Sequence, residues 1–406
     1  MYIPRYLEEN VRKVHRTFKV LYLGGPRQVG KSTMLLHLAR SRKMTYVTLD
    51  DLAQRELAQK DPELFLQTYP APLLIDEVQY APALFSSIKL RVDRSSKTGQ
   101  YWLTGSQQFG LMRHMQESLA GRVGILTLLG FSRAEAHREK RLRHPFFPKR
   151  AYHPIQDDSF TIHDIYSLIL RGSFPAVWLN ERLDRTTYYN SYIQTYIDRD
   201  LRDIFHVTKI SEFHTFLRLC AARTGSILSV SELARDTGIS VHAAREWLSI
   251  LENTRHIYLL RPYFSNISKR LIKSPKIYFL DTGLAAYLTN WKTAEVLGSG
   301  AMAGAFFETL IVGEIIKSYL FRGEEPPLYY LRDKEGHEVD VLIERERILY
   351  PLEIKIAARV VPSDCATMRY FRNKIPKIGP GAVITPGSRY QPIDREHTMI
   401  PLSAIS

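Results

Sequence analysis

The 406-residue sequence is poor in cysteine, in long apolar runs and in acidic residues. Its two cysteines, Cys220 and Cys365, are too few for a disulfide framework or a cysteine-rich zinc module. Apolar stretches such as 123–131 fall well short of the roughly 18 residues that a membrane-spanning helix needs. The first twenty residues lack the apolar core of a secretory signal. We therefore expect a cytoplasmic protein without a membrane-embedded part.

Acidic residues are outnumbered by basic ones. The chain has 56 Lys and Arg against 42 Asp and Glu, a formal net charge of +14. A surplus of this size favours a polyanionic partner such as a nucleic acid, although solubility alone tolerates it. Hydrophobic residues make up 45% and charged residues 24%, close to the average of soluble globular proteins. This composition excludes a mainly disordered or fibrous chain, and the length allows several domains.

Changes of pattern along the chain predict four modules. Short apolar runs alternate with helix-like segments over 1–155, which is typical of a parallel sheet covered on both faces. Helix-like periodicity follows over 156–210, and three short helical patterns follow over 211–265. Strands return over 266–406, with helices between them. The expected fold class is α/β: a nucleotide-type α/β domain, a helical lid, a small helical reader and a terminal α/β domain.

A phosphate-binding loop is the strongest motif. Residues 25–32 read GPRQVGKS and fit G-x-x-x-x-G-K-[ST] between an expected strand and an expected helix. Backbone N–H groups of such a loop cradle phosphate oxygens, and the positive end of the helix faces the same anion. Lys31 is expected to reach the β- and γ-phosphates of ATP, and Ser32 to bind Mg²⁺; an ordinary strand–turn–helix junction is the alternative. The expected ATP-binding residues are Gly25, Pro26, Arg27, Gln28, Val29, Gly30, Lys31, Ser32 and Thr33.

An acidic pair ends a later apolar segment, LLIDE. Asp76 suits the position that holds Mg²⁺ and its water, and Glu77 suits a base that orients the attacking water. Together with the phosphate loop, this pair predicts ATP hydrolysis rather than ATP binding alone.

Two further residues are candidates for the ATPase site. The next expected strand, YWLTGS, places Ser106, or less favourably Thr104, near the γ-phosphate, with a plain turn as the alternative. Arg122, in SLAGR, is a candidate arginine finger that stabilises charge on the phosphates. Its alternative is a solvated surface arginine. If Arg122 acts on a neighbour's nucleotide, catalysis needs a homo-oligomer.

The motifs GPRQVGKSTML, LLIDEVQ, WLTGSQ and SLAGR, in this order, resemble those of prokaryotic AAA-type ATPases that carry a C-terminal domain of unknown function, DUF4143. Later segments extend the resemblance over nearly the whole chain, among them RGSFP, YIQTYIDRDL, KIYFLDTGLAAYL and FFETLIVGEI. The resemblance implies a P-loop ATPase of the AAA-like branch. It implies much less about the biological role.

The segment 226–262 predicts a helix-turn-helix followed by a β-wing, that is, a winged helix. A short helix opens near Ser231, the turn reads DTGIS, and the second helix runs over 241–251. Contacts of this second helix with DNA would go mostly to phosphates. Acidic residues on the same helix make a protein–protein spacer the alternative. The residues expected to contact DNA are His242, Arg245, Lys269, Arg270 and Lys273.

A D…E-x-K pattern marks the terminal module. Asp340 lies on one expected strand, and Glu353 and Lys355 share a face of the next, because residues two apart on a strand point the same way. Glu308 lies on a helix upstream. Carboxylates suit a hard cation such as Mg²⁺, and a lysine can position the water that attacks a phosphodiester. The pattern resembles the PD-(D/E)XK nucleases of the restriction-endonuclease-like fold, with Val339 in the place of the proline.

These observations predict an ATP-hydrolysing, AAA-like switch or motor that acts on DNA, with ATP and Mg²⁺ as cofactors. One alternative is a regulatory switch that binds a protein partner and carries a vestigial nuclease domain. The other is an ATP-regulated, metal-dependent nuclease.

Overall fold

The computed structural model describes residues 2–105, 115, 117–139, 144–148, 160–197, 209–264, 273–357, 359–375, 377–387 and 389–405. Ser106, Lys269 and Arg270 lie outside these ranges, so their predicted roles stay predictions. None of the described helices is long and apolar enough to cross a membrane.

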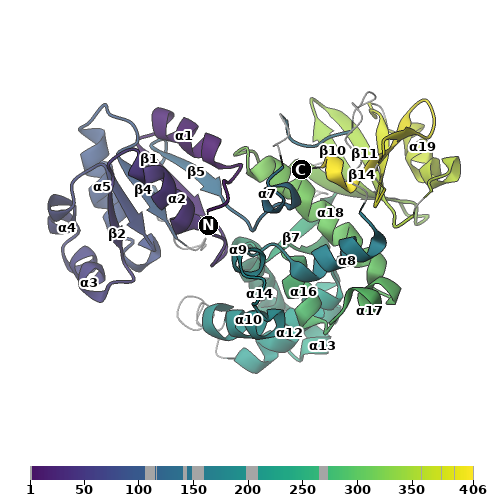
Figure 1. Cartoon of the computed structure of the whole chain (residues 1–406), viewed down its shortest axis with the longest axis horizontal. Helices are drawn as coiled ribbons and strands as arrows, with labels where there is room; N and C mark the ends of the chain where they lie inside the picture. The colour runs from purple at the N-terminus through teal and green to yellow at the C-terminus, as the bar shows by residue number, and fades with distance from the viewer. Residues whose placement is uncertain are drawn as a thin grey trace.

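The N-terminal part is a five-stranded parallel sheet in the order β2–β3–β4–β1–β5, drawn at the left of Figure 1. The strands are β1 (Val20–Gly24), β2 (Thr45–Thr48), β3 (Leu73–Asp76), β4 (Tyr101–Thr104) and β5 (Val123–Thr127). The helices are α1 (Glu8–Thr17), α2 (Lys31–Arg40), α3 (Leu52–Lys60), α4 (Pro62–Thr68), α5 (Leu84–Asp93) and α7 (Arg133–Ala136), with a 3-10 turn at Val78–Tyr80. The predicted α/β character of this region is confirmed.

The central strands of this sheet are buried on both faces, which is why they read as nearly continuous apolar runs. Alternate residues of each strand face opposite sides. On β1, Leu21 and Leu23 pack in the same core as residues of α1 and α2, whereas Val20 and Tyr22 pack with residues of α4 and α5. Helices therefore cover both faces.

The middle of the chain is mostly helical. Its helices are α8 (Ile162–Arg171), α9 (Pro175–Leu179), α10 (Arg185–Tyr192), a π-helical turn at Ile193–Ile197, α12 (Ile210–Ala222), α13 (Val230–Thr237), α14 (Val241–Asn253), α16 (Thr282–Leu288) and α17 (Ala294–Ser299). Ser240 caps α14 by accepting from the Ala243 N–H, and Gly238, at φ +76°, makes the turn between α13 and α14.

A nine-stranded sheet runs through the middle and the C-terminal parts, in the order β13–β14–β12–β11–β10–β9–β7–β8–β6. Its strands are β6 (Ser226–Ile227), β7 (Ile257–Pro262), β8 (Lys276–Phe279), β9 (Leu328–Arg332), β10 (Glu338–Arg345), β11 (Ile348–Ile354), β12 (Gly381–Thr385), β13 (Gln391–Pro392) and β14 (His397–Pro401). Strand β7 pairs with β8 antiparallel and with β9 parallel. The strands of the helical reader and of the terminal module thus belong to one sheet.

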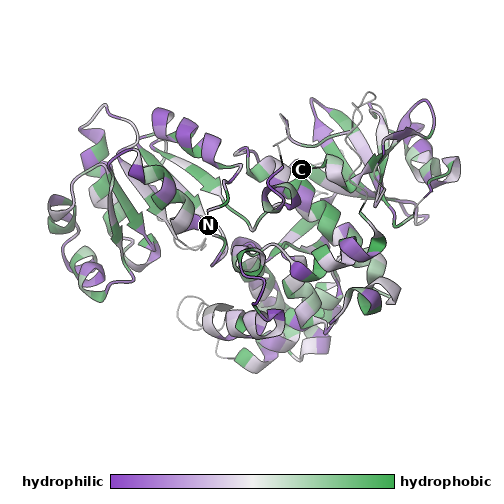
Figure 2. Ribbon diagram, viewed as in Figure 1, coloured by the Kyte–Doolittle hydropathy of each residue, from purple (hydrophilic) through white to green (hydrophobic). Residues whose placement is uncertain are grey.

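Helix α18 (Ala303–Leu320) is buried along most of its length, while α19 (Ala366–Arg372) covers the outer part of the nine-stranded sheet. Two 3-10 turns, Pro362–Cys365 and Leu402–Ala404, complete the terminal part. Figure 2 shows the corresponding pattern: hydrophobic residues concentrate on the strands of both sheets and on α18, and hydrophilic residues on outer helices such as α1.

A buried arginine connects the phosphate loop with the segment that leaves the five-stranded sheet. The Arg5 guanidinium donates to the carbonyl oxygens of Val29 (2.9 Å) and Leu129 (2.8 Å) and pairs with Glu135 at 3.1 Å. From the other side, the Glu314 carboxylate on α18 accepts from the Arg133 backbone N–H at 2.9 Å. The phosphate-loop residue Val29 is therefore tied to the segment that leads into the rest of the chain.

Candidate functional site

The predicted phosphate loop lies at the carboxyl edge of the five-stranded sheet, between β1 and α2. Gly25, at φ +142°, is confined to glycine, because a Cβ there would lie 2.0 Å from the Leu128 carbonyl oxygen. Gly30, at φ +93°, caps α2 in a left-handed conformation that glycine adopts at no steric cost. The two glycines turn the loop back over the start of α2, where the helix N–H groups are unsatisfied.

Lys31 lies inside this loop. Its side chain is buried, and Nζ donates to the carbonyl oxygens of Gly25 (3.0 Å) and Pro26 (2.7 Å). The ammonium group is therefore held against the backbone turn that would surround a phosphate.

Ser32 and Asp76 meet at the same edge. The Ser32 hydroxyl hydrogen-bonds the Asp76 carboxylate at the end of β3, and the Tyr46 hydroxyl donates to the same carboxylate at 3.1 Å. Burial raises the pKa of Asp76, and the bond from Ser32 lowers it again. A hydroxyl and a carboxylate oxygen are the ligands that Mg²⁺ prefers. These two residues thus fit the predicted ion.

Glu77 follows directly in an unusual backbone conformation, with φ at +55°. Its backbone N–H donates to Asp76 Oδ1 at 3.1 Å, and its carboxylate is hydrogen-bonded by Gln79. Arg27 of the phosphate loop lies 3.8 Å from Glu77 Oε1. The sequence interpretation identified Glu77 but missed both of these partners, since neither Arg27 nor Gln79 is singled out by a spacing rule.

Thr104 ends β4 one residue beyond the Ile75–Leu103 pair, and so lies level with Asp76. It is fully buried, and Oγ1 has no hydrogen-bond partner in the described part of the chain. Since a buried hydroxyl normally finds a partner, this oxygen is suited to a ligand at the carboxyl edge. The role predicted for Thr104 near a γ-phosphate stays a prediction.

Arg122 lies at the amino-terminal ends of the strands, opposite the carboxyl edge that carries the phosphate loop. It immediately precedes β5, its carbonyl accepts from the Val20 N–H at 3.1 Å, and its guanidinium pairs with Asp93, with Nη2–Oδ2 at 3.0 Å. The five-residue strand β1 separates Val20 from the phosphate loop, which is roughly 15 Å at the rise of an extended strand. Arg122 cannot reach a phosphate bound by its own loop.

The predicted DNA-contacting side chains of α14 point outward. His242 and Arg245 are exposed, while Ala244, Trp247 and Leu248 are buried against the neighbouring helices. Glu246 is also exposed and lies 3.6 Å from His242 Nδ1. Lys273 is exposed as well, just before β8.

The carboxylates of the predicted nuclease pattern come together around a lysine. Lys276 on β8 is buried, and its Nζ lies 3.1 Å from Glu308 and 2.6 Å from Glu338. Asp340 Oδ1 lies 3.8 Å from the same ammonium group, and Asp340 Oδ2 accepts from the Ile354 N–H at 2.9 Å. The pattern search missed Lys276. A single charge in the otherwise apolar strand KIYF was the available signal.

Lys355 takes a different partner from the one expected. Its Nζ donates to Asp364 at 2.7 Å, while Glu353, two residues before it, is hydrogen-bonded to Asp340. The structure therefore brings Glu308, Asp340 and Glu353 into one cluster with Lys276, and it directs Lys355 toward Asp364.

The cluster holds more carboxyl groups than the single ammonium group of Lys276 can pair with. Burial, reinforced by Asp340, raises the pKa of Glu308 to about 7 and that of Glu353 to about 9. One oxygen of Glu353, Oε1, is buried without a partner among the described residues. Buried carboxyl groups that can release their protons to a cation fit a hard divalent metal, so Glu308, Asp340 and Glu353 fit the predicted metal.

Comparison with known proteins assigns three regions of the chain. Residues 17–137 match the model of an AAA domain, residues 162–295 that of a domain of unknown function (DUF8612), and residues 303–405 that of a domain of unknown function (DUF4143). The chain therefore carries an AAA ATPase domain. More particularly, it combines this domain with a C-terminal DUF4143 domain, as the order of its motifs predicted.

Two curated relatives, uncharacterized proteins of Mycobacterium bovis and Mycobacterium tuberculosis, are each 28% identical over 396 residues, 97% of this chain and 82% of theirs. Among solved structures, a Walker-type ATPase of Pyrococcus abyssi is 13% identical over 70% of this chain and 94% of that one, with a TM-score of 0.45. The RuvB Holliday junction branch migration motor of Thermotoga maritima is 17% identical over 62% and 88%, with a TM-score of 0.30. Scores this low support no functional inference.

The raised pKa of Glu353 predicts a pH-dependent stability. Folded Glu353 keeps its proton up to about pH 9, whereas the unfolded residue loses it near 4.5, so raising the pH across this window favours unfolding. Glu353→Gln cannot ionise. Its free energy of unfolding relative to the wild type should therefore increase from pH 5 to pH 9, by at most about 1.4 kcal/mol per pH unit. Urea unfolding at several pH values measures this difference.

Glu346→Gln, at an exposed glutamate of the same region, is the matched control and should show no such trend. A constant difference between Glu353→Gln and the wild type across the window would contradict the buried, protonated state of Glu353.

Proposed function

We propose that this protein is an ATP-hydrolysing, AAA-like switch or motor that acts on DNA. The observation that carries the proposal is the convergence of Lys31, the Ser32–Asp76 pair and Glu77 at one edge of the parallel sheet. The AAA domain match over the same residues supports it.

The proposed chemistry assigns one task to each side chain. Lys31 would exchange its carbonyl partners for the β- and γ-phosphate oxygens. Ser32 and Asp76 would hold Mg²⁺, which neutralises charge on the phosphates when bound. Glu77 would orient and polarise the attacking water, and Arg27 would keep its carboxylate beside the loop until then.

The elements α12–β6–α13–α14–β7–β8 support the proposal of a winged helix. Helices α13 and α14 are joined through the tight turn at Gly238, and β6, β8 and β7 form antiparallel pairs beside them. In this proposal Arg245 and His242 on α14 meet DNA phosphates, aided by the basic segment that contains Lys269, Arg270 and Lys273. The net charge of +14 favours the same partner.

The first test is steady-state ATP turnover at near-physiological salt, with and without duplex DNA. Wild-type turnover should rise with DNA, because the DNA-binding elements are coupled to the ATPase site. Glu77→Gln should keep ATP binding but lose turnover by about 100-fold or more, because the water loses its base. Arg245→Ala should reduce the stimulation by DNA, whereas Arg235→Ala, at an exposed arginine of α13, should not.

If DNA does not change ATP turnover and Glu77→Gln is still inactive, the proposed action on DNA is overturned. The proposed ATP hydrolysis is then retained. That result would favour the regulatory switch with a protein partner. Raising the salt distinguishes the two further, since phosphate contacts weaken steeply with salt through counterion release.

We also propose that Arg122 acts on the nucleotide of a neighbouring subunit. Its place at the edge opposite its own phosphate loop supports action in trans, and the exposed pair with Asp93 would hold it ready in the isolated chain. Catalysis would then require a homo-oligomer in which one subunit's Arg122 faces the next subunit's Lys31.

Mixing two inactive variants tests this arrangement. Arg122→Ala retains Glu77, and Glu77→Gln retains Arg122, so a mixed oligomer contains complete sites at some interfaces. ATP turnover should reappear on mixing and reach a maximum near equal amounts. Asp93→Asn, which loses the resting partner of Arg122 only, should stay active by itself. Failure of the mixture to recover activity, with both variants still assembling, would contradict action in trans.

Metal-dependent cleavage by the DUF4143 domain is a second candidate function. The carboxyl groups gathered around Lys276, and the Glu353 oxygen that has no partner among the described residues, favour it. In this candidate Asp340 and Glu353 would hold Mg²⁺ and a lysine would position water. Lys276 stands in the cluster, whereas Lys355 is paired with Asp364.

Nuclease assays with Mg²⁺ separate the two lysines. Lys355→Ala should abolish cleavage if the D…E-x-K pattern is the active one, with ATP turnover unchanged. If Lys276→Met abolishes cleavage and Lys355→Ala does not, Lys276 is the lysine of the site. The absence of cleavage by wild-type protein over a range of DNA substrates would make the domain a vestigial nuclease.

A further inference from the structure

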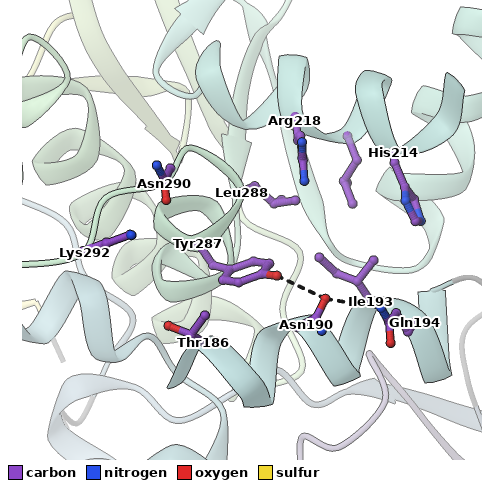
Figure 3. Close-up of a pocket in the computed structure, with 11 residues that line it drawn as sticks. Thr186, Asn190, Ile193, Gln194, His214, Arg218, Tyr287, Leu288, Asn290 and Lys292 are labelled. Atoms are coloured by element: carbon purple, nitrogen blue, oxygen red, sulfur yellow. Dashed lines mark hydrogen bonds between the residues drawn. The ribbon is translucent and has the colours of Figure 1, made fainter. Parts of the chain in front are cut away.

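A pocket lies where three helical elements of the middle region meet. Its volume is about 600 Å³. Figure 3 shows side chains from α12 on one side and from α10 on the other, with the Tyr287 ring of α16 entering between them. We call it the α10–α12 pocket, and its lining residues are Thr186, Asn190, Ile193, Gln194, His214, Leu217, Arg218, Tyr287, Leu288, Asn290 and Lys292.

The lining of the α10–α12 pocket combines apolar surface with positive charge. Leu217 and Leu288 are buried beside the half-buried ring of Tyr287, whose hydroxyl donates to Asn190 Oδ1 at 3.3 Å. The exposed side chains of Arg218 and Lys292 make no hydrogen bond or ion pair with the described part of the chain. Among the described residues that line the pocket, none is acidic. A ligand that matches this lining has a flat, largely apolar body and a negative charge.

A second hollow, of about 500 Å³, adjoins the first. The two share Lys292, and the second is also lined by Arg171 and Arg185, with Glu181 as its one acidic residue among the described lining residues. The Arg185 guanidinium donates to the Lys292 carbonyl oxygen at 3.4 Å, so the two basic residues are neighbours. Cations spaced along consecutive hollows fit an extended polyanion with a repeating charge better than one small anion.

We propose that the α10–α12 pocket binds one nucleotide of a single nucleic-acid strand, with its base on Tyr287 and its phosphates on Arg218 and Lys292. The backbone of the strand continues past Lys292 into the second hollow. A planar base on an aromatic ring and phosphates on unpaired cations are the two contacts that bind single strands without sequence preference. This proposal rests on the nucleic-acid partner of the proposed function, but it requires neither ATP hydrolysis nor duplex binding by α14.

Fluorescence anisotropy of a labelled thymidine oligonucleotide of about ten residues, with the full chain and without ATP, tests the proposal. The double variant Arg218→Ala/Lys292→Ala should bind about tenfold or more weakly at low salt. The slope of log affinity against log salt should fall by about 1.4, since each phosphate contact of a single strand contributes about 0.7. A purely structural role of the two residues would not change this slope.

Substitutions of Tyr287 test the base contact separately. Tyr287→Leu should weaken binding by about fivefold or more with the salt slope unchanged, since it removes a stacking surface and no charge. Tyr287→Phe keeps the ring, loses only the bond to Asn190, and should bind like the wild type. Equal losses from both substitutions would overturn the stacking role.

The matched control removes the same charge elsewhere. Lys334→Ala/Arg395→Ala changes two exposed cations of the terminal region and should leave strand binding within about twofold of the wild type. If this control loses as much as Arg218→Ala/Lys292→Ala, binding is diffuse and the proposal is overturned. The proposal also fails if thymidine monophosphate displaces the oligonucleotide at a similar concentration, because the ligand is then a free nucleotide.

Failure of this proposal is distinguishable from failure of the proposed function. Duplex-stimulated ATP turnover that depends on Arg245, together with strand binding indifferent to Arg218 and Lys292, would overturn only the pocket. If strand binding depends on Arg218 and Lys292 but DNA does not change ATP turnover, the proposed strand site in the pocket is retained. The proposed coupling between DNA and ATP turnover is then overturned.

Discussion

Arg5 carries a full charge into the buried junction between the five-stranded sheet and the rest of the chain, and the surrounding backbone has to satisfy it. An unpaired charge at such a place costs several kcal/mol, so its partners Val29, Leu129 and Glu135 have to stay in place together. Val29 belongs to the phosphate loop, and Leu129 begins the segment that leaves the sheet. The loop therefore cannot change shape without also changing the path of the chain toward the C-terminal parts.

A second contact reaches the same loop from the helical region. The Tyr188 hydroxyl on α10 donates to the Gln28 side chain at 2.8 Å, and α10 also lines the α10–α12 pocket through Asn190. One helix thus has the phosphate loop on one side and a basic pocket on another. Any ligand that prefers one position of α10 would alter the affinity for ATP, and ATP would alter the affinity for that ligand by the same factor.

Sequence patterns identified residues that the structure brings together at the phosphate-loop edge, because their arrangement is local: Lys31 and Ser32 are adjacent, and Asp76 ends an apolar strand. They failed where an ion-pair partner is distant in the sequence. Lys276 meets Glu308 and Glu338 only because β8 lies beside α18 and the β10 end, and no spacing rule connects these segments. Lys355 was expected on the same strand as Glu353, but it lies one residue beyond the end of β11, and its ammonium group donates to Asp364, nine residues further on. The sheet edge occupied by Arg122 likewise depends on strand order rather than on motif.

The parallel pair of β7 and β9 has a consequence for how the chain can be divided. Family models place β7 within 162–295 and β9 within 303–405, so a boundary drawn between the two models cuts through a hydrogen-bonded ladder. A fragment that begins near residue 300 would expose β9 as an unpaired edge strand, which invites association with other chains and aggregation. The boundary between the two family models therefore differs from any boundary at which this chain could be cut into stable fragments.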